Sequence, residues 1–288
     1  MQEQTAKRRV AVVTDSTAYL PPHMVNQYAI EVVPLCLMMG DQTWLDGVEI
    51  DPPGFYGLLK NSSLFPSTSQ PNVAAFDEVY KRLSQQVEGI VSIHISNELS
   101  GTIQSARGAA ANLPDVPIEI VDSRGTSMTL GFPVLVAAKA AAAGADLPTV
   151  AGLAQAATER THIYFVVDTL EFLHRGGRIG AAAKLLGSAL NLKPILEIRD
   201  GVVQPVTKVR TRGKALARVY DLLEEQLPPD ARYQLAVVNV DAVPGAMQVR
   251  DDLAARFRPT EEIMLTECSP VIGAHTGPGT IGVAYFLE

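Results

Sequence analysis

Cysteine is nearly absent from this chain. Its 288 residues include only Cys36 and Cys268, which lie far apart in the sequence. Disulfide-dependent domains are dense in cysteine, and structural zinc sites need clustered cysteine and histidine ligands. The sequence therefore excludes a disulfide scaffold and a cysteine–histidine zinc site. We expect two free or buried thiols in a reducing compartment.

Long hydrophobic runs are also missing. The longest apolar stretch, residues 130–143, is interrupted by Pro133 and Lys139. A transmembrane helix needs about 20 apolar residues in a row, so we expect no transmembrane segment. The start of the chain is polar and basic, but the apolar run after it, Val10–Val13, is too short for the core of a signal peptide. We therefore expect a cytoplasmic protein.

The chain also lacks an excess of positive charge. The chain has 24 lysine and arginine residues against 31 aspartate and glutamate residues, which gives a net charge of −7. Nucleic-acid-binding proteins usually carry a basic face, so we expect no nucleic-acid partner. The glycine-rich segments do not match a P-loop or a dinucleotide fingerprint. The nucleophile elbow of many hydrolases, Gly-x-Ser-x-Gly, is missing as well.

What the chain does have is 47% apolar residues, enough for a large core and an internal cavity. In the first half, apolar runs such as residues 10–14, 89–95 and 118–121 each end in a turn that contains hydroxyl or carboxyl side chains, and a helical pattern follows. The repeated order of strand, turn and helix predicts an α/β fold with a parallel sheet. Ligands of such sheets bind beyond the carboxyl ends of the strands.

The second half contains fewer such units and predicts an α+β arrangement. A hairpin is expected around residues 199–201, and closing strands are expected near residues 262–267 and 282–287. We predict two domains, an N-terminal one of residues 1–158 and a C-terminal one of residues 159–288.

Three segments are rich in hydroxyls and turn residues. They are Phe-Pro-Ser-Thr-Ser-Gln-Pro at 65–71, Ser-Asn-Glu-Leu-Ser-Gly-Thr at 96–102 and Gly-Ala-His-Thr-Gly-Pro-Gly at 273–279. The first two open onto predicted helices and contain no lysine or arginine. Hydroxyls and free backbone N–H groups at a helix start form an uncharged cradle for one oxyanion, and Gly101 allows close backbone approach. This pattern indicates a carboxylate site.

The same residues also have ordinary structural interpretations. Thr68, Ser69 and Ser100 can cap helices. His275 is expected in a loop between two strands, where it can be a surface turn residue, and His94 is expected to be a hydrogen-bonded core histidine. The alternative activity is that of a hydrolase or phosphotransferase that uses Ser100 and His275, which requires the two side chains to be in contact.

Two segments of the second half are basic. They are Gly176-Gly177-Arg178 and Lys208-Val209-Arg210-Thr211-Arg212. Each alone is an ordinary solvated segment. In an acidic protein, however, two such segments can form a local basic patch that suits a partner protein or a phosphate group.

Taken in order, eight motifs resemble the DegV family of bacterial fatty-acid-binding proteins. They are Val13–Thr17, Thr68–Pro71, Leu99–Thr102, Val121–Ser123, Asp168–Leu170 with Gly176–Ile179, Lys193–Ile195, Lys208–Thr211 and Gly273–Gly279. The resemblance covers nearly the whole chain. It implies a two-domain α/β protein that holds one long-chain fatty acid, such as palmitate, between its domains. It also implies a lipid-binding carrier without catalytic residues, metal or other cofactors.

The resemblance further implies roles for particular residues. The carboxylate is expected at Thr68 and Ser100, with Ser69, Ser96 and Gly101 beside them and His275 closing over the head group. Some members of the family present the acid to a separate fatty acid kinase, which makes an acyl phosphate. The arginines linked to this step correspond to Arg178 and Arg210, and less closely to Arg212. We therefore expect a fatty acid kinase or an acyltransferase as the partner, in lipid transport or fatty acid metabolism.

Overall fold

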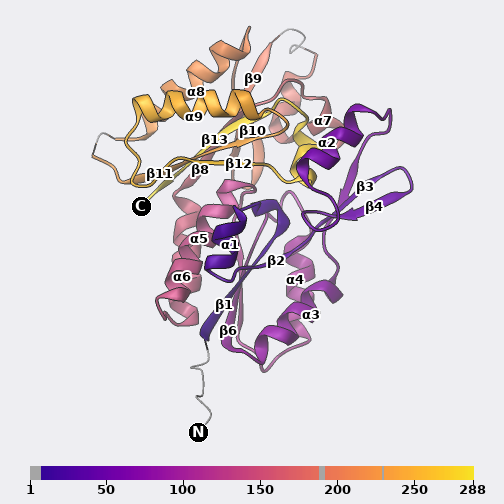
Figure 1. Cartoon of the computed structure of the whole chain (residues 1–288), viewed down its shortest axis with the longest axis vertical. Helices are drawn as coiled ribbons and strands as arrows, with labels where there is room; N and C mark the ends of the chain where they lie inside the picture. Colours follow the sequence, from indigo (N-terminus) through magenta and orange to yellow (C-terminus); the bar gives the residue numbers. More distant parts are fainter. Residues whose placement is uncertain (1–7, 188–191, 229) are drawn as a thin grey trace.

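The computed structural model describes residues 8–187, 192–228 and 230–288. Two sheets, one in each lobe, are stacked along the long axis of the molecule (Figure 1). The lower lobe of Figure 1 contains most of the first half of the chain, and the upper lobe contains most of the second half.

The sheet of the lower lobe is parallel and has the order β2-β1-β6-β7. Its strands are β1 (Arg8–Asp15), β2 (Glu31–Val33), β6 (Val87–His94) and β7 (Ile118–Asp122). Both faces are covered by helices, so the central strands are almost continuous runs of buried apolar residues. This arrangement confirms the predicted α/β fold with a parallel sheet.

The helices of this lobe lie in two layers. One face packs against α3 (Val73–Ser84) and α4 (Thr102–Ala111), and the other packs against α5 (Met128–Ala142) and α6 (Leu147–Glu159). Two further short helices are η1 (Ser16–Ala18) and α1 (Pro22–Gln27). Several helices begin where a side chain accepts a backbone hydrogen bond, as Asn72 does for α3 and Asp146 for α6.

A small three-stranded sheet extends from the side of the lower lobe (Figure 1). Its strands, in the order β4-β3-β5, are β3 (Cys36–Met39), β4 (Gln42–Leu45) and β5 (Ser67–Ser69). Helix α2 (Pro52–Lys60) lies between β4 and β5 in the chain, and the Asp51 side chain caps it by accepting a hydrogen bond from the Gly54 N–H. The apolar stretch of residues 30–39 is divided between β2 and β3, which belong to different sheets.

The sheet of the upper lobe has six strands in the order β10-β9-β8-β13-β11-β12. They are β8 (Thr161–Val166), β9 (Lys193–Arg199), β10 (Val202–Val209), β11 (Tyr233–Asn239), β12 (Met264–Glu267) and β13 (Ile281–Leu287). All neighbouring pairs are antiparallel except β11 and β12. The predicted hairpin at residues 199–201 is the turn between β9 and β10.

Two long helices, α8 (Arg212–Gln226) and α9 (Val243–Arg256), pack on this sheet, and Figure 1 shows them above it. Three short helices complete the lobe: α7 (Glu171–Arg175), η2 (Gly180–Leu185) and α10 (Pro270–Thr276). Helix α10 contacts α7 of its own lobe, and it also contacts α2, β3 and β5. It therefore joins the upper lobe to the small sheet.

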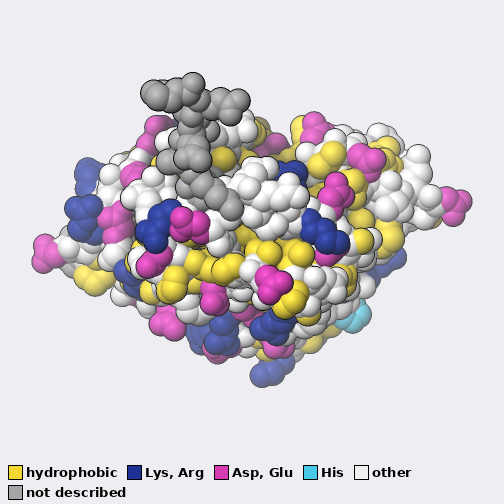
Figure 2. All heavy atoms as spheres, turned by 90° about the horizontal axis from the view of Figure 1, so that it is seen from below, with side chains coloured by type: hydrophobic (Ala, Val, Ile, Leu, Met, Phe, Trp, Pro, Cys, Tyr) yellow, Lys and Arg dark blue, Asp and Glu magenta, His cyan; other side chains and the backbone are white. Residues whose placement is uncertain are grey.

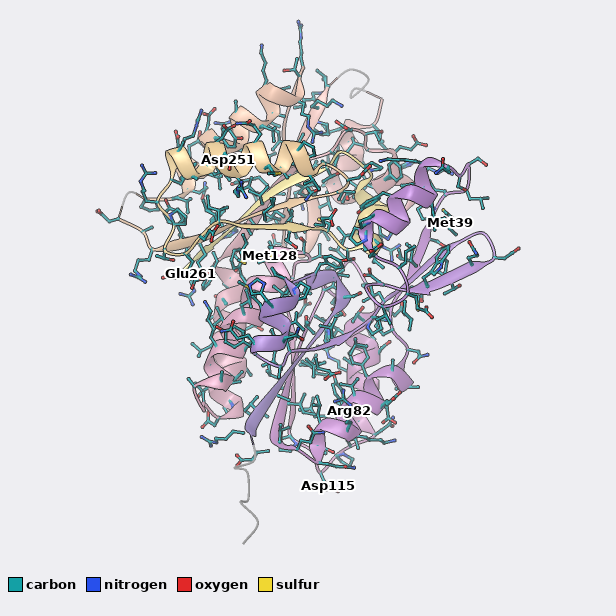
Figure 3. The ribbon with its side chains drawn as sticks, viewed as in Figure 1. Met39, Arg82, Asp115, Met128, Asp251 and Glu261 are labelled. Carbon is teal, nitrogen blue, oxygen red and sulfur yellow. The ribbon has the colours of Figure 1, made fainter. Side chains whose placement is uncertain are left out.

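Helix α5 lies between the two large sheets. It packs against β1 and β6 on one side and against β8 and β13 on the other. Phe132 of α5 stacks on Phe286 of β13 with ring centroids 5.9 Å apart. Met128, the first residue of α5, is fully buried in the middle of the molecule, as Figure 3 shows. A helix that is apolar on all sides belongs in a core, and α5 is the centre of a core that both lobes share.

Acidic and basic side chains are interspersed on the face shown in Figure 2. Cys36 and Cys268 are free thiols. Among the described helices, none has the length and apolar character that a membrane crossing requires. The described residues also contain no cluster of three or more His, Cys, Asp or Glu side chains suited to a metal ion.

Candidate binding cavity

A cavity between the lobes brings the hydroxyl-rich segments together. It contains about 630 Å³ of unoccupied space, counting the part open to solvent. Thr68 and Ser69 reach it from β5, with Gln70 directly after that strand, Ser100 from the loop after β6, and His275 with Thr276 from α10. Thr126 and Arg178 complete its polar lining. Most of the remaining wall is apolar: Leu35, Ile95, Leu99, Phe165, Leu173, Ile198, Val203, Val271 and Ile272.

His275 and Thr68 form the central polar contact of this cavity. The His275 Nε2 atom lies 2.8 Å from the Thr68 Oγ1 atom. The other ring nitrogen, Nδ1, is buried and has no hydrogen-bond partner among the described residues. A buried N–H without an acceptor is costly, so the tautomer with its proton on Nε2 fits this site best. His275 then donates to Thr68, and the hydroxyl proton of Thr68 remains free to bind a ligand oxygen.

The surroundings of His275 keep its ring uncharged. Burial, with a smaller effect from the nearby positive charge of Arg178, lowers its pKa to about 4. Gly176 is a close neighbour, because a Cβ atom at this position would lie 2.2 Å from the Nδ1 atom. Substitution of Gly176 would therefore displace the ring.

The predicted loop around His275 is wrong. This residue lies in the last turn of α10, which Ser269 caps and Gly277 ends with a φ of 79°. The glycine and proline residues that we interpreted as loop signals instead mark the end of a short helix. The helical backbone fixes the direction of the His275 ring toward β5.

Ser100 is held by its own helix start. Its Oγ atom lies 2.9 Å from the Thr102 Oγ1 atom and accepts a longer hydrogen bond of 3.3 Å from the Thr102 N–H. Gly101 lies against Gln70, since a Cβ atom at residue 101 would come within 2.9 Å of the Gln70 Nε2 atom. Gly101 does not line the cavity itself, but it allows β5 and the loop after β6 to approach each other.

The predicted hydroxyls do not all meet at the cavity. Ser69 lines it, and its hydroxyl also donates to the backbone carbonyl of Gln70 at 3.3 Å. Ser96 is completely buried outside the lining and donates to the carbonyl of Gly201 at 2.8 Å. The Ser96 hydroxyl therefore ties the loop after β6 to the β9–β10 turn.

Arg178 changes the electrostatics that we expected. The two hydroxyl segments contain no cation, but Arg178 approaches the cavity from the segment after α7. Its guanidinium donates to the carbonyl of Leu99 at 3.1 Å and to that of Gly176 at 2.8 Å. The expectation of an entirely uncharged cradle is therefore wrong, since the cavity contains one positive charge.

The other predicted arginines lie elsewhere. Arg210 is exposed just after the end of β10 and does not line the cavity. Arg212 forms an ion pair with Asp168 at 3.0 Å, and Lys193 forms a second one with the same carboxylate at 2.9 Å. The basic residues of the upper lobe are thus divided between the cavity and the outer surface.

A second hollow adjoins the apolar part of the cavity. It contains about 340 Å³ of unoccupied space and shares Thr126, Phe165, Ile198, Ile272 and Thr276 with the first. Its other lining residues are Ser127, Ile163, Val238, Cys268 and Thr280. We refer to the two adjoining hollows as the acyl chamber, a name that describes their mostly apolar walls.

Most of these walls could not be predicted from the sequence. Gln70 and the apolar lining residues come from strands, loops and short helices that are far apart in the chain. The only local signal was the alternation of side chains along β8, where Ile163 and Phe165 face the chamber. No pattern within one segment predicts which faces of several segments will meet.

Comparison with known proteins agrees with this architecture. The chain matches the model of a family described as "Uncharacterised protein, DegV family" over residues 9–288. It is 41% identical over 277 residues to a DegV domain-containing protein of Streptomyces coelicolor, covering 96% of this chain and 98% of that protein. Protein DegV of Bacillus subtilis is 34% identical over 280 residues, with 97% and 99% of the two chains covered.

Solved structures give the same result. The fatty-acid-binding DegV family protein of Thermus thermophilus superposes with a TM-score of 0.92 at 33% identity, over 97% of this chain and 100% of that one. DegV of Bacillus subtilis, a fatty acid binding protein, superposes with a TM-score of 0.90 at 33% identity, over 98% and 100%. On this sequence match and this fold, the chain belongs to the DegV family.

Proposed function

We propose that this protein binds one long-chain fatty acid in the acyl chamber, between an N-terminal domain of residues 1–158 and a C-terminal domain of residues 159–288. The carboxylate would accept hydrogen bonds from Thr68 and Ser100, with Arg178 close enough to add a charged donor. The alkyl tail would lie along the apolar walls toward Ile163 and Val238. The fatty-acid-binding relatives of known structure support the same choice of ligand.

One observation carries this proposal most directly. The Thr68 hydroxyl, in contact with His275, lines the first hollow together with Ser100 and Arg178, and most of the remaining wall of that hollow is apolar. A carboxylate accepts hydrogen bonds and donates none at neutral pH. A ligand with one carboxylate and a long apolar body therefore matches this group of donors and the mostly apolar walls beside it.

The energetics explain why a few hydrogen bonds suffice for the head group. Burial of each methylene group contributes ~0.8 kcal/mol. About fifteen methylenes, as in palmitate, contribute on the order of 12 kcal/mol before the costs of ordering the ligand and the protein. The tail can thus provide most of the affinity. The head group then fixes the orientation of the acid and can stay accessible to a second protein.

Native mass spectrometry of freshly purified protein tests this proposal. We expect a bound mass that matches a fatty acid of 14 to 18 carbons, and uptake of added palmitate by protein stripped of its ligand. Protein that is reproducibly empty and takes up no acid would refute the proposal. Hydrolysis of ester substrates that is lost in Ser100→Ala would instead favour the hydrolase. Against that alternative, Ser100 contacts Thr102, whereas His275 contacts Thr68.

We further propose that the bound acid is presented in the cytoplasm to a partner kinase, which forms an acyl phosphate. Arg210 is the better residue for testing docking, because it is exposed and outside the cavity lining. We expect Arg210→Ala to bind palmitate like wild type and to lower acyl phosphate formation by the kinase at least tenfold. Arg178→Ala should impair both properties. Equal loss of both in Arg210→Ala would assign a structural role to that residue.

A further inference from the structure

The sheet of the upper lobe is split next to the acyl chamber. Strands β8 and β9 pair at only three positions, Val166 with Ile195, Phe165 with Leu196 and Tyr164 with Glu197. In the described part of these strands the ladder ends there, although β8 continues to Thr161 beside β13 and β9 continues to Arg199 beside β10. The two strands therefore separate beyond Tyr164, and an opening forms between their ends.

A polar groove lies at this opening. It contains about 1240 Å³ of unoccupied space, including the part open to solvent. Its aromatic side is formed by His162, Tyr164 and Tyr285, with ring centroids 5.0 Å apart for His162 and Tyr285 and 6.4 Å for Tyr164 and Tyr285. The groove also contains the mostly buried carboxylate of Glu197, which pairs with Arg199, and the ion pair between Arg124 and Asp200.

Ile198 separates the groove from the acyl chamber. This residue lines both hollows of the chamber and the polar groove. Its neighbours Glu197 and Arg199 point to the other face of the sheet, as alternation along a strand requires. Ile198 and the Thr126–Thr129 turn therefore lie at the border between the acyl chamber and the polar groove.

We propose that the ligands of this site include fatty acids with a hydroxyl group at the ω end, whose last carbons pass Ile198 and place the hydroxyl in the groove. The inference rests on the proposed fatty acid function. A hydroxyl both donates and accepts hydrogen bonds, and the groove offers tyrosine hydroxyls, a histidine and carboxylates. A second carboxylate fits less well, because the acidic residues Glu159, Glu197 and Asp200 outnumber the basic Arg124 and Arg199 in the lining.

The experiment compares two ligands of equal length on purified, delipidated protein. Isothermal titration calorimetry gives the dissociation constants of hexadecanoic acid and 16-hydroxyhexadecanoic acid. A hydroxyl buried without a partner weakens binding by roughly tenfold or more. If the groove receives the hydroxyl, the two constants should differ by less than about threefold. In Ile198→Ala, which widens the passage, the ratio should shift toward the hydroxy acid.

Val203→Ala is the matched control. Val203 pairs with Ile198 on the neighbouring strand and lines the same chamber, but it does not border the groove. Val203→Ala should weaken the binding of both ligands equally, so the ratio of their dissociation constants should stay at the wild-type value. The inference is overturned if wild type binds hexadecanoic acid at least tenfold more tightly than the hydroxy acid and Ile198→Ala shows the same ratio of dissociation constants. That result would leave the proposed function intact. Binding of neither acid overturns the proposed function itself.

Discussion

Two histidines, one in the core of the lower lobe and one at the cavity, show how similar side chains serve different purposes. His94 is completely buried, and both of its ring nitrogens are occupied, Nδ1 by Asp15 at 3.0 Å and Nε2 by Ser92 at 2.7 Å. Tyr80 extends this chain with a hydrogen bond to Ser92. His275 has one partner, Thr68, and an unoccupied Nδ1. A saturated network holds a fold together, whereas an incomplete one beside a cavity can accept a ligand.

The buried network in the lower lobe has the residue types of a hydrolytic triad, namely Asp15, His94 and Ser92. None of the three is exposed, and none lines the acyl chamber. A nucleophile needs access to its substrate, so this array is structural. It ties β1 to β6 at the centre of the parallel sheet, and Asp15 also accepts from the Ile95 N–H and from Thr17.

The largest expected effect comes from breaking the saturated network. His94→Ala removes a partner of Asp15 in the core, and loss of one member of a buried polar pair costs about 3–5 kcal/mol. His275→Ala should lower the free energy of unfolding by less than half as much, because it removes the hydrogen-bond partner of only one hydroxyl, that of Thr68, beside a cavity. Urea unfolding of both variants at pH 8 measures the free energy of unfolding. Equal losses of unfolding free energy in the two variants would contradict the conclusion that His94 is structural and His275 is not.

The next effect is a pH dependence that only His275 should produce. Its pKa is about 4 in the folded protein and about 6.5 when exposed, so the unfolded chain binds the extra proton in between. The stabilising contribution of the neutral ring is complete above pH 6.5. It is lost as the pH falls through 4, with a total of about 3 kcal/mol. His275→Gln, which does not titrate, should lose less stability over this range.

Asp46 also makes the free energy of unfolding depend on pH. Burial raises the pKa of its carboxyl group to about 7, and the hydroxyl of Ser16 donates to it at 2.7 Å. Its contribution has the opposite sign, because a raised carboxyl pKa favours folding at low pH and opposes it as the pH rises toward 7. Asp46 is present in both wild type and His275→Gln, so its contribution cancels when the free energies of unfolding of the two proteins are subtracted at each pH. An identical pH profile for the two proteins would contradict the assignment to His275.

The smallest effects concern single hydroxyls. Thr68→Ala and Ser100→Ala should each weaken palmitate binding by about 1–2 kcal/mol, the cost of a lost buried hydrogen bond. Thr68→Ser, which keeps the hydroxyl, should bind nearly as well as wild type. Ser96→Ala is the internal control, since its hydroxyl bonds Gly201 outside the cavity and should affect stability only. Calorimetric titration with palmitate resolves these differences, and full affinity in both alanine variants would place the carboxylate elsewhere.

Much of the fold was predictable because its signals are local. The Asp51 cap, the Pro52–Lys60 helix and the alternation of strand and helix over the lower lobe depend on neighbours in the chain. The division of residues 30–39 between two sheets was not predictable, because it depends on which distant strands pair with them. The position of His275 was missed for a related reason. Ser269 and Pro270 start a helix of only seven residues, too short for periodicity to reveal.

The sequence allowed us to predict that the polar segments meet, but it did not reveal the apolar lining of the cavity. Thr68, Ser100 and His275 belong to turn-rich segments whose composition indicates a head-group site, and the structure brings all three to one cavity. Arg178 was expected to serve a partner, and its place in the lining follows from the path of the chain after α7. The apolar lining is ordinary in every local window, and only the assembly of both sheets around α5 makes it a chamber.

The shared position of α5 also determines how a guest molecule can enter. Separating the two sheets would strip the apolar surface of α5 from one of them, at ~25 cal/mol for every Å² exposed. Hinge-like opening of the whole protein is therefore disfavoured, and chemical denaturation should proceed in one cooperative step. An entry route for a fatty acid that leaves the central stack closed would therefore involve the small peripheral elements, the β3–β4–β5 sheet with α2 and the short helices α7 and α10.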